Sequence, residues 1–155
     1  MSLALGIVVI IAALSGVVVL RRKHAEQQEM DRRSITPEDL RALLASNQDL
    51  LLFDLRQPLD LLAYPEIIPR AQRIPPDEVL ANPALIPQEK DSVVYCTCPS
   101  DKTSRMVLRH ALKLQFYRIK LLKGGLAAWK AKGYPVDPYN EVFHLYMPSL
   151  PQRQG

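Results

Sequence analysis

The stretch "SVVYCTCPSDKTSRMVLRHALKLQFYRIKLL", residues 92–122, decides the fold class of this 155-residue chain. Its first part, residues 92–96, is a short apolar run of the kind that forms a strand buried on both faces of a sheet. Residues 103–116 then have helical character, and residues 118–122 form a second apolar run that predicts another strand. Strands that alternate with helices in this way are typical of an α/β domain with a mainly parallel sheet. The helical face toward that sheet is expected to carry the following residues: Met106, Val107, His110, Ala111 and Leu114.

The segments on both sides of this stretch extend the same pattern. Thr36 and Pro37 predict the start of a helix over residues 36–46, as N-cap and first helical residue. An apolar run at residues 50–56 predicts a further buried strand. The proline-dense residues 57–90 allow only short elements, including a strand within 71–74 and one helical turn at 76–80. After a turn at "KGG", a last short helix is expected to end at Gly133.

The N-terminal segment predicts a single membrane-spanning helix. Residues 3–20 carry no charge, and as a helix they rise about 27 Å, close to the thickness of a bilayer core. The basic run Arg21, Arg22 and Lys23 follows, which the positive-inside rule puts in the cytoplasm. We therefore expect a single-pass protein of the cell membrane, with its domain in the cytoplasm and its thiols reduced.

Four parts of the chain follow from these patterns. Residues 1–23 form the transmembrane helix and its basic flank, and residues 24–34 form a linker or a helical extension. Residues 35–138 form the α/β domain, and residues 139–155 form a tail, partly packed through Phe143 and Tyr146.

Composition excludes several classes of function. The net charge is +4, of which the basic run after the apolar segment supplies three charges, so the domain lacks the basic surface of a nucleic-acid-binding protein. Two cysteines cannot make a disulfide framework. The histidines His24, His110 and His144 have no metal-ligand spacing. We expect no metal and no cofactor.

Both cysteines, Cys96 and Cys98, lie where a predicted strand ends and a predicted helix begins. Backbone N–H groups and the helix dipole at such a junction favour a thiolate, which suits a nucleophile. The other readings are a buried apolar cysteine and a Cys-x-Cys redox pair. The strand pattern favours Cys96 as nucleophile, whereas counting back from the helix start favours Cys98, and we put Cys96 first. The residues expected to cradle an anion in this loop are Ser100, Lys102, Thr103, Ser104 and Arg105.

Four motifs in order resemble the rhodanese-like domains over residues 35–137: "LLLFDLRQPLDL", "IIPRAQRIP", "VVYC" and "LLKGGLAAWKAKGYPV". The resemblance implies a three-layer α/β fold and a sulfurtransferase that carries sulfane sulfur as a cysteine persulfide between donors and acceptor thiols. It also implies structural or pocket-rim roles for Asp54 and Arg56. The chain further resembles the rhodanese domains fused behind the last membrane helix of DedA-like proteins, which implies a membrane-protein partner.

The chain departs from the family pattern in its loop. The loop has no glycine, and the fifth residue after each cysteine is Asp101 or Thr103, where the family has arginine. Pro99 lacks an N–H donor, and Arg70 stands where the family has a glycine. Two alternatives to the enzyme therefore remain open, a non-catalytic docking module and a Cys-x-Cys redox switch.

Overall fold

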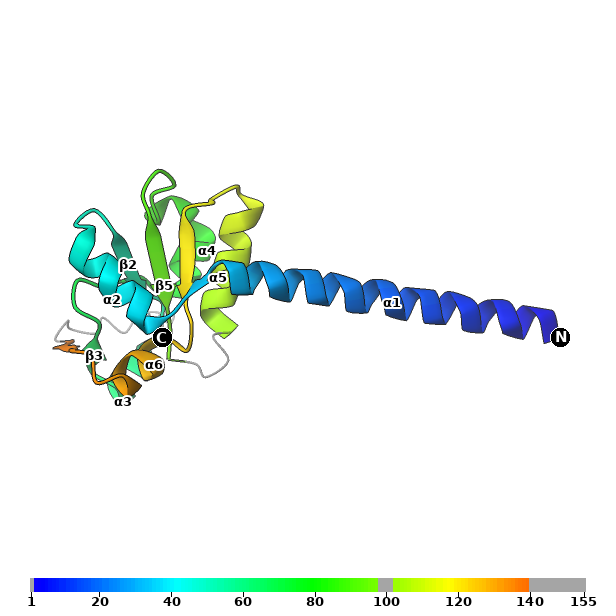
Figure 1. The fold of residues 1–155 in the computed structure, drawn as a ribbon, viewed down its shortest axis with the longest axis horizontal. Coiled ribbons are helices and arrows are strands. Elements are labelled where there is room, and N and C mark those ends of the chain that lie inside the picture. Colours follow the sequence, from blue (N-terminus) through cyan, green and yellow to red (C-terminus); the bar gives the residue numbers. More distant parts are fainter. Residues whose placement is uncertain (1, 98–101, 140–155) are drawn as a thin grey trace, which may run out of the picture.

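The computed structural model describes the backbone of residues 2–97 and 102–139, and the side chains of residues 14–97 and 102–139. Its centre is a five-stranded sheet with the order β1-β6-β5-β2-β4 (Figure 1). The strands are β1 (Ser34–Ile35), β2 (Leu51–Asp54), β4 (Gln72–Arg73), β5 (Ser92–Tyr95) and β6 (Ile119–Leu122). All four pairings are parallel, which confirms the predicted sheet. The short strand β1 was not predicted.

Helices cover both faces of the sheet because successive strand residues point to opposite sides. On one face, α2 (Pro37–Ser46) and α6 (Gly125–Ala131) contribute Leu40, Leu126 and Trp129 to a core with Leu52 and Val93.

The other face has its own core. There α4 (Pro76–Ala81), α5 (Lys102–Lys113) and the end of α1 (Ser2–Arg32) pack against the strand residues Phe53 and Val94. The three-layer α/β architecture is therefore as expected.

Helix α5 packs through a different face from the one predicted. Its buried residues are Ser104, Val107, Leu108 and Ala111, with helical spacing, whereas Met106 is 45 % and Leu114 43 % exposed. The prediction was wrong for Met106 and Leu114 because the buried face of α5 begins with a polar residue, Ser104. A prediction from apolar residues alone leaves a buried serine out, and it therefore placed the buried face about one residue away around the helix.

The proline-dense segment forms only short elements, as predicted. It contains α3 (Pro58–Ala63), β3 (Glu66–Ile67), α4 and a 3₁₀ turn η1 (Pro83–Leu85), in addition to β4. Strand β3 pairs with β7 (Asp137–Pro138) in a separate antiparallel pair. Helix α3 and both strands of this pair were not predicted.

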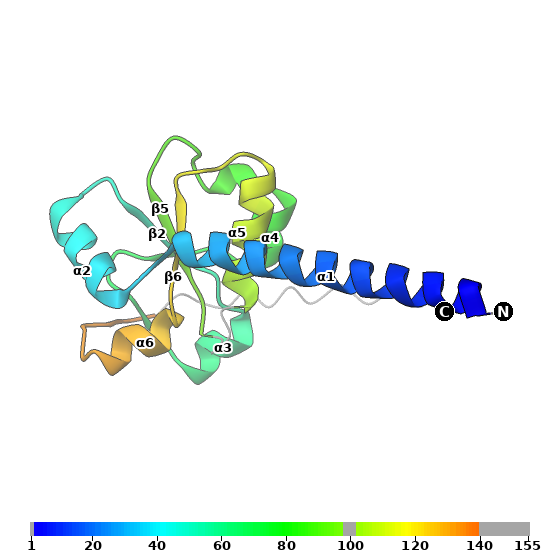
Figure 2. The same ribbon diagram turned by 45° about the vertical axis from the view of Figure 1, so that its right-hand side comes forward.

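Helix α1 is continuous and projects away from the domain (Figures 1 and 2). Its last turns dock on the domain: Met30 is 2 % exposed, Glu26 pairs with Arg109 at 2.6 Å, and Arg105 donates to Gln27 at 3.0 Å. Residues 24–32 are thus the helical extension that the sequence left as one alternative.

The apolar run at residues 3–20 falls partly on residues 1–13, whose side chains are outside the described part of the chain. Among the residues that are described, no helix combines the length and hydropathy required to cross a bilayer.

Candidate active site at the cysteine edge

Cys96 lies directly after β5, at the edge of the sheet where the parallel strands end. Its neighbour in the sheet is the end of β2, since Asp54 is the register partner of Tyr95 and Leu55 N–H donates to the Tyr95 carbonyl at 2.8 Å. Cys96 is 1 % exposed. We refer to this edge, formed by the ends of β2, β4 and β5, as the cysteine edge. Carboxyl ends of parallel strands are where open α/β sheets bind ligands.

The segment that follows β6, Gly124 to Leu126, packs closely against the backbone of Cys96. Leu126 N–H donates to the Cys96 carbonyl at 3.0 Å. Gly125 has a φ of +54°, and a Cβ placed there would lie 1.9 Å from the same carbonyl oxygen. Gly124 also has a positive φ, of +73°. Glycine is therefore required here both for backbone conformation and for close approach.

A buried ion pair lies at the end of β2, next to the cysteine edge. Asp54 and Arg56 are both fully buried, and Arg56 Nη2 lies 2.6 Å from Asp54 Oδ2. The guanidinium also donates to the carbonyls of Tyr64 at 2.8 Å and Glu66 at 2.5 Å. Arg56 therefore joins the end of β2 to the segment that leaves α3. The family resemblance implied structural or pocket-rim roles for both residues, and the structure places both of them in this buried network.

Tyr95 completes this buried polar group. Its hydroxyl accepts a hydrogen bond from Ile68 N–H at 3.2 Å. Burial, together with the negative charge of Asp54, raises the pKa of this hydroxyl far above its ordinary value. Tyr95 therefore stays protonated and acts here as a structural anchor.

The predicted anion cradle is only partly within the described residues. Cys98 and Ser100 lie outside them, so their placement stays a prediction. Lys102 begins α5 and is exposed, and Thr103 is half-buried in its first turn.

The next two cradle residues have buried polar atoms. Ser104 is fully buried, and its Oγ has no hydrogen-bond partner among the described residues. Arg105 donates from Nη1 to α1, while its Nε is buried without a partner in the same part of the chain. Arg105 thus contacts α1 in addition to lying near the loop.

Arg73 is a residue of this edge that sequence reasoning missed. It ends β4 and is the register partner of Asp54. Its Nε and Nη2 are buried and have no hydrogen-bond partner among the described residues. Buried N–H groups without a partner are costly, and an anion bound at the edge would satisfy them. A basic residue at the end of a two-residue strand carries little sequence signal of its own. Gly125 was also missed as a site residue, although "KGG" marked its turn.

Arg70, the departure from the family's glycine, has its own structural reason. Its φ is +69°, the conformation for which glycine is favoured. Its guanidinium donates to the carbonyls of Leu44 and Gln48 at 2.7 Å each, with longer bonds to Asn47 and Leu50. The side chain thereby binds carbonyls in the last turn of α2 and in the segment that follows it, which offsets the strained backbone.

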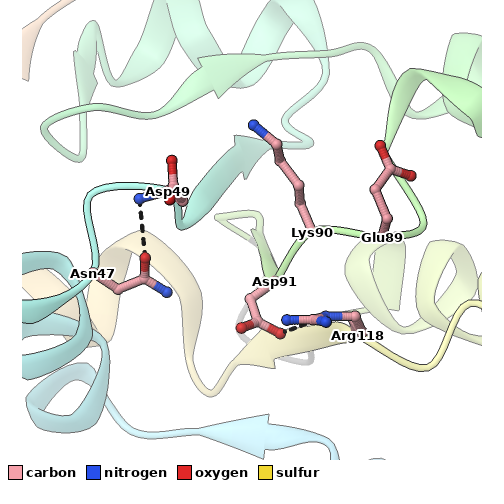
Figure 3. A pocket seen from close by; sticks show the side chains of 6 residues that line it. All are labelled: Asn47, Asp49, Glu89, Lys90, Asp91 and Arg118. Carbon is pink, nitrogen blue, oxygen red and sulfur yellow. Dashed lines mark hydrogen bonds and ion pairs between the residues drawn. The ribbon is translucent and has the colours of Figure 1, made fainter.

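The opposite edge of the sheet carries a shallow charged hollow (Figure 3). Arg118 donates to Asp91 at 3.0 Å there, with both side chains about half exposed. The hollow is lined by Asn47, Asp49, Glu89, Lys90, Asp91 and Arg118. No cluster of potential metal ligands occurs among the described residues. The hollow lies at the starts of β2, β5 and β6, away from Cys96.

Comparisons with known proteins agree with this geometry. The sequence profile of the rhodanese-like domain matches residues 36–132. A protein of Allochromatium vinosum named sulfurtransferase is 30% identical over 102 residues, covering 66% of this chain and 92% of the relative.

Solved structures share the fold. A thiosulfate sulfurtransferase from Pseudomonas aeruginosa superposes with a TM-score of 0.61 at 21% identity, over 74% of this chain and 22% of that one. A rhodanese-related protein from Thermoplasma volcanium gives a TM-score of 0.54 at 24% identity, over 68% of this chain and 97% of that one.

Proposed function

The chain belongs to the rhodanese-like domain family, and we propose that it is a sulfurtransferase that carries sulfane sulfur as a persulfide on Cys96. The observation that carries the proposal is the fixed position of Cys96. Its carbonyl is bound by Leu126 N–H, its strand end is braced by the buried Asp54–Arg56 pair, and α5 begins six residues later. The sulfurtransferase name of the relative from Allochromatium vinosum supports the same activity.

The chemistry is a double displacement at sulfur. The Cys96 thiolate attacks the outer sulfur of a donor such as thiosulfate, a sulfur–sulfur bond forms, and sulfite leaves with the electron pair of the broken bond. A thiolate acceptor or cyanide then attacks the outer sulfur of the persulfide and releases the Cys96 thiolate. No external oxidant or reductant is needed.

The residues around the loop suit an anionic substrate. The first N–H groups of α5 and its dipole favour negative charge, and Lys102 adds a full positive charge at the same helix end. Arg73 contributes buried N–H donors without a described partner, and Ser104 contributes a buried hydroxyl. The helix end and Lys102 favour a thiolate over a thiol and attract an anionic donor such as thiosulfate.

Mass spectrometry of the thiosulfate-treated full chain tests the proposal. We expect one added sulfur per chain, located on Cys96, that is removed by cyanide. The variant Cys96→Ser should lose this sulfur, and the matched variant Cys98→Ser should keep it. If Cys98→Ser alone abolishes loading, the nucleophile is Cys98. If neither variant lowers loading, the sulfurtransferase proposal fails.

The same experiment separates the two alternatives. A docking module would take up no sulfur in the wild-type chain, as the altered loop with Pro99 would suggest. A redox switch would instead lose two hydrogens on mild oxidation, through a Cys96–Cys98 disulfide, and form no persulfide.

We also propose that α1 anchors the protein in the cell membrane, with the domain on the cytoplasmic side beside a membrane-protein partner that accepts sulfur. The uncharged run at residues 3–20 and the basic residues Arg21–Lys23 support this orientation. In the described part of the run, apolar side chains such as Leu14 and Leu20 are 61 % and 68 % exposed. Retention of the full chain in alkali-washed membranes, and its loss in a Val17→Asp/Val18→Asp variant, would test the anchor.

A further inference from the structure

The last turns of α1 bind α5, the helix that follows Cys96. Gln27 Oε1 accepts a hydrogen bond from Arg105 Nη1 at 3.0 Å, and Glu26 pairs with Arg109 at 2.6 Å. Met30, one turn further along α1, is 2 % exposed and belongs to the core cluster that contains the buried apolar residues of α5. In Figures 1 and 2 the domain end of α1 accordingly lies next to α5.

The contact between Gln27 and Arg105 is defined from both sides. The Gln27 amide also donates from Nε2 to Asp31 Oδ1 at 3.1 Å, so it cannot turn without losing a hydrogen bond. The Nε of Arg105 is buried without a partner, and the hydrogen bond to Gln27 is the one that its guanidinium makes within the described part of the chain. The position of the Arg105 side chain therefore depends on Gln27.

Arg105 connects this contact to the start of α5. It is the fourth residue of the helix, which begins six residues after Cys96. Ser104 is fully buried, so the first turn is buried at one residue and bound to α1 at the next. The free N–H groups and the dipole of a helix end favour a thiolate only while that turn keeps its helical form. Loosening of the first turn would therefore make the Cys96 thiolate less favourable.

We propose that Gln27 is a positioning residue for Cys96, which acts through Arg105 and keeps the first turn of α5 in the geometry that favours the thiolate. The proposal rests on the proposed function, since it concerns the nucleophile of the same reaction. Gln27 lies outside the segment that matches the family, residues 36–132. The reactivity of Cys96 thus depends on a helix that precedes the family domain.

Sulfur loading of the full chain by thiosulfate, measured at Cys96 by mass spectrometry, tests this coupling. Gln27→Ala removes the acceptor for Arg105, and we expect the loading rate to fall about threefold. Gln28→Ala is the matched control, because Gln28 is the next residue of α1 and its side chain bonds to His24 of the same helix at 3.2 Å. Gln27→Glu keeps an acceptor oxygen for Arg105 and should load at a rate close to that of the wild type. Equal rates in Gln27→Ala and Gln28→Ala would overturn the proposal, as would a Gln27→Glu variant as slow as Gln27→Ala.

Alkylation by iodoacetamide measures the same coupling without sulfur transfer. In a Cys98→Ser background, Cys96 is the one remaining cysteine of the chain. We expect the pH of half-maximal alkylation rate to be higher with Gln27→Ala than without it, because the thiolate loses support from the helix end. The substitution changes no charge and leaves in place the charged groups of the cysteine edge and of the start of α5, which are Asp54, Arg56, Arg73, Lys102 and Arg105. A purely structural loss would lower the folded fraction and leave this pH unchanged.

The two measurements distinguish failure of the coupling from failure of the proposed function. Normal sulfur loading without a shift in the alkylation profile of Gln27→Ala would overturn the coupling alone. A wild-type chain that takes up no sulfur, together with the expected shift in alkylation, would overturn sulfur transfer and support the coupling. If Cys96 reacts with neither reagent, both proposals fail.

Discussion

Two arginines, one at each edge of the sheet, bind backbone carbonyls in very different surroundings. At the cysteine edge, Arg56 is fully buried and pairs with the buried carboxylate of Asp54. At the opposite edge, Arg70 is exposed and binds carbonyls at and just after the end of α2, and no carboxylate of the described residues pairs with it.

The difference shows how the two edges are stabilised. A buried guanidinium loses its hydration, so the cysteine edge depends on every one of its partners being present. An exposed guanidinium can exchange a carbonyl for water, so the opposite edge tolerates loss of single contacts. We therefore expect substitutions at the cysteine edge to cost more stability than substitutions at the opposite edge.

The substitution Asp54→Asn should have the largest effect on stability. It keeps the shape of the side chain but leaves the Arg56 charge buried without its anion, which costs about 3–5 kcal/mol in the free energy of unfolding. Urea unfolding followed by circular dichroism measures this. The matched control is Asp91→Asn at the opposite edge, whose exposed pair with Arg118 should be lost without measurable change. Equal losses in both variants would contradict the comparison of the edges.

The substitution Gly125→Ala should come next. The new Cβ would lie 1.9 Å from the Cys96 carbonyl oxygen, and the positive φ adds strain, so we expect a loss of more than about 2 kcal/mol. Sulfur loading of Cys96 should also slow. Gly133→Ala is the control, since it has a similar φ of +68° with no atom within 4 Å, and it should cost only about 1 kcal/mol. Equal losses of unfolding free energy in both variants would mean that the close approach of Gly125 to Cys96 does not contribute to stability.

Local sequence patterns and long-range contacts differ in how far they can be predicted from the sequence. The main strands and helices were predictable because their patterns are local, as for the Thr36 cap, whose hydroxyl accepts from Asp39 N–H at 3.1 Å. The role of Gly125 was not, because its partner Cys96 is distant in the chain. Arg70 was visible only as a departure from the family, since the carbonyls it binds lie 20–26 residues earlier.

Two substitutions of Arg70 separate its backbone strain from its hydrogen bonds. Both Arg70→Ala and Arg70→Gly remove the guanidinium, but only glycine adopts a φ of +69° without strain. The alanine variant should therefore be less stable than the glycine variant by about 1 kcal/mol, measured as the difference in unfolding free energy. The glycine variant should lie closer to the wild type. Equal stability of the alanine and glycine variants would mean that the backbone at residue 70 changes its φ without cost.

The smallest effect on stability should come from Glu38→Gln. This variant tests whether an ion pair in this domain contributes little to stability when it is exposed. Glu38 lies in the first turn of α2 and pairs with Lys132 after α6 at 2.6 Å, with both side chains about half exposed. The hydrogen bond from Lys132 holds the pKa of Glu38 below its ordinary value. The pair therefore stabilises the fold above that ordinary value, and the contribution is lost as the pH falls through the lowered pKa. We expect a slightly lower melting temperature for the variant than for the wild type at about pH 7. This difference should shrink as the pH falls below the ordinary pKa of a glutamate, and it should be absent in high salt. A large loss at neutral pH would mean that exposure does not weaken an ion pair of this domain, and the contrast between Arg56 and Arg70 would then need another cause.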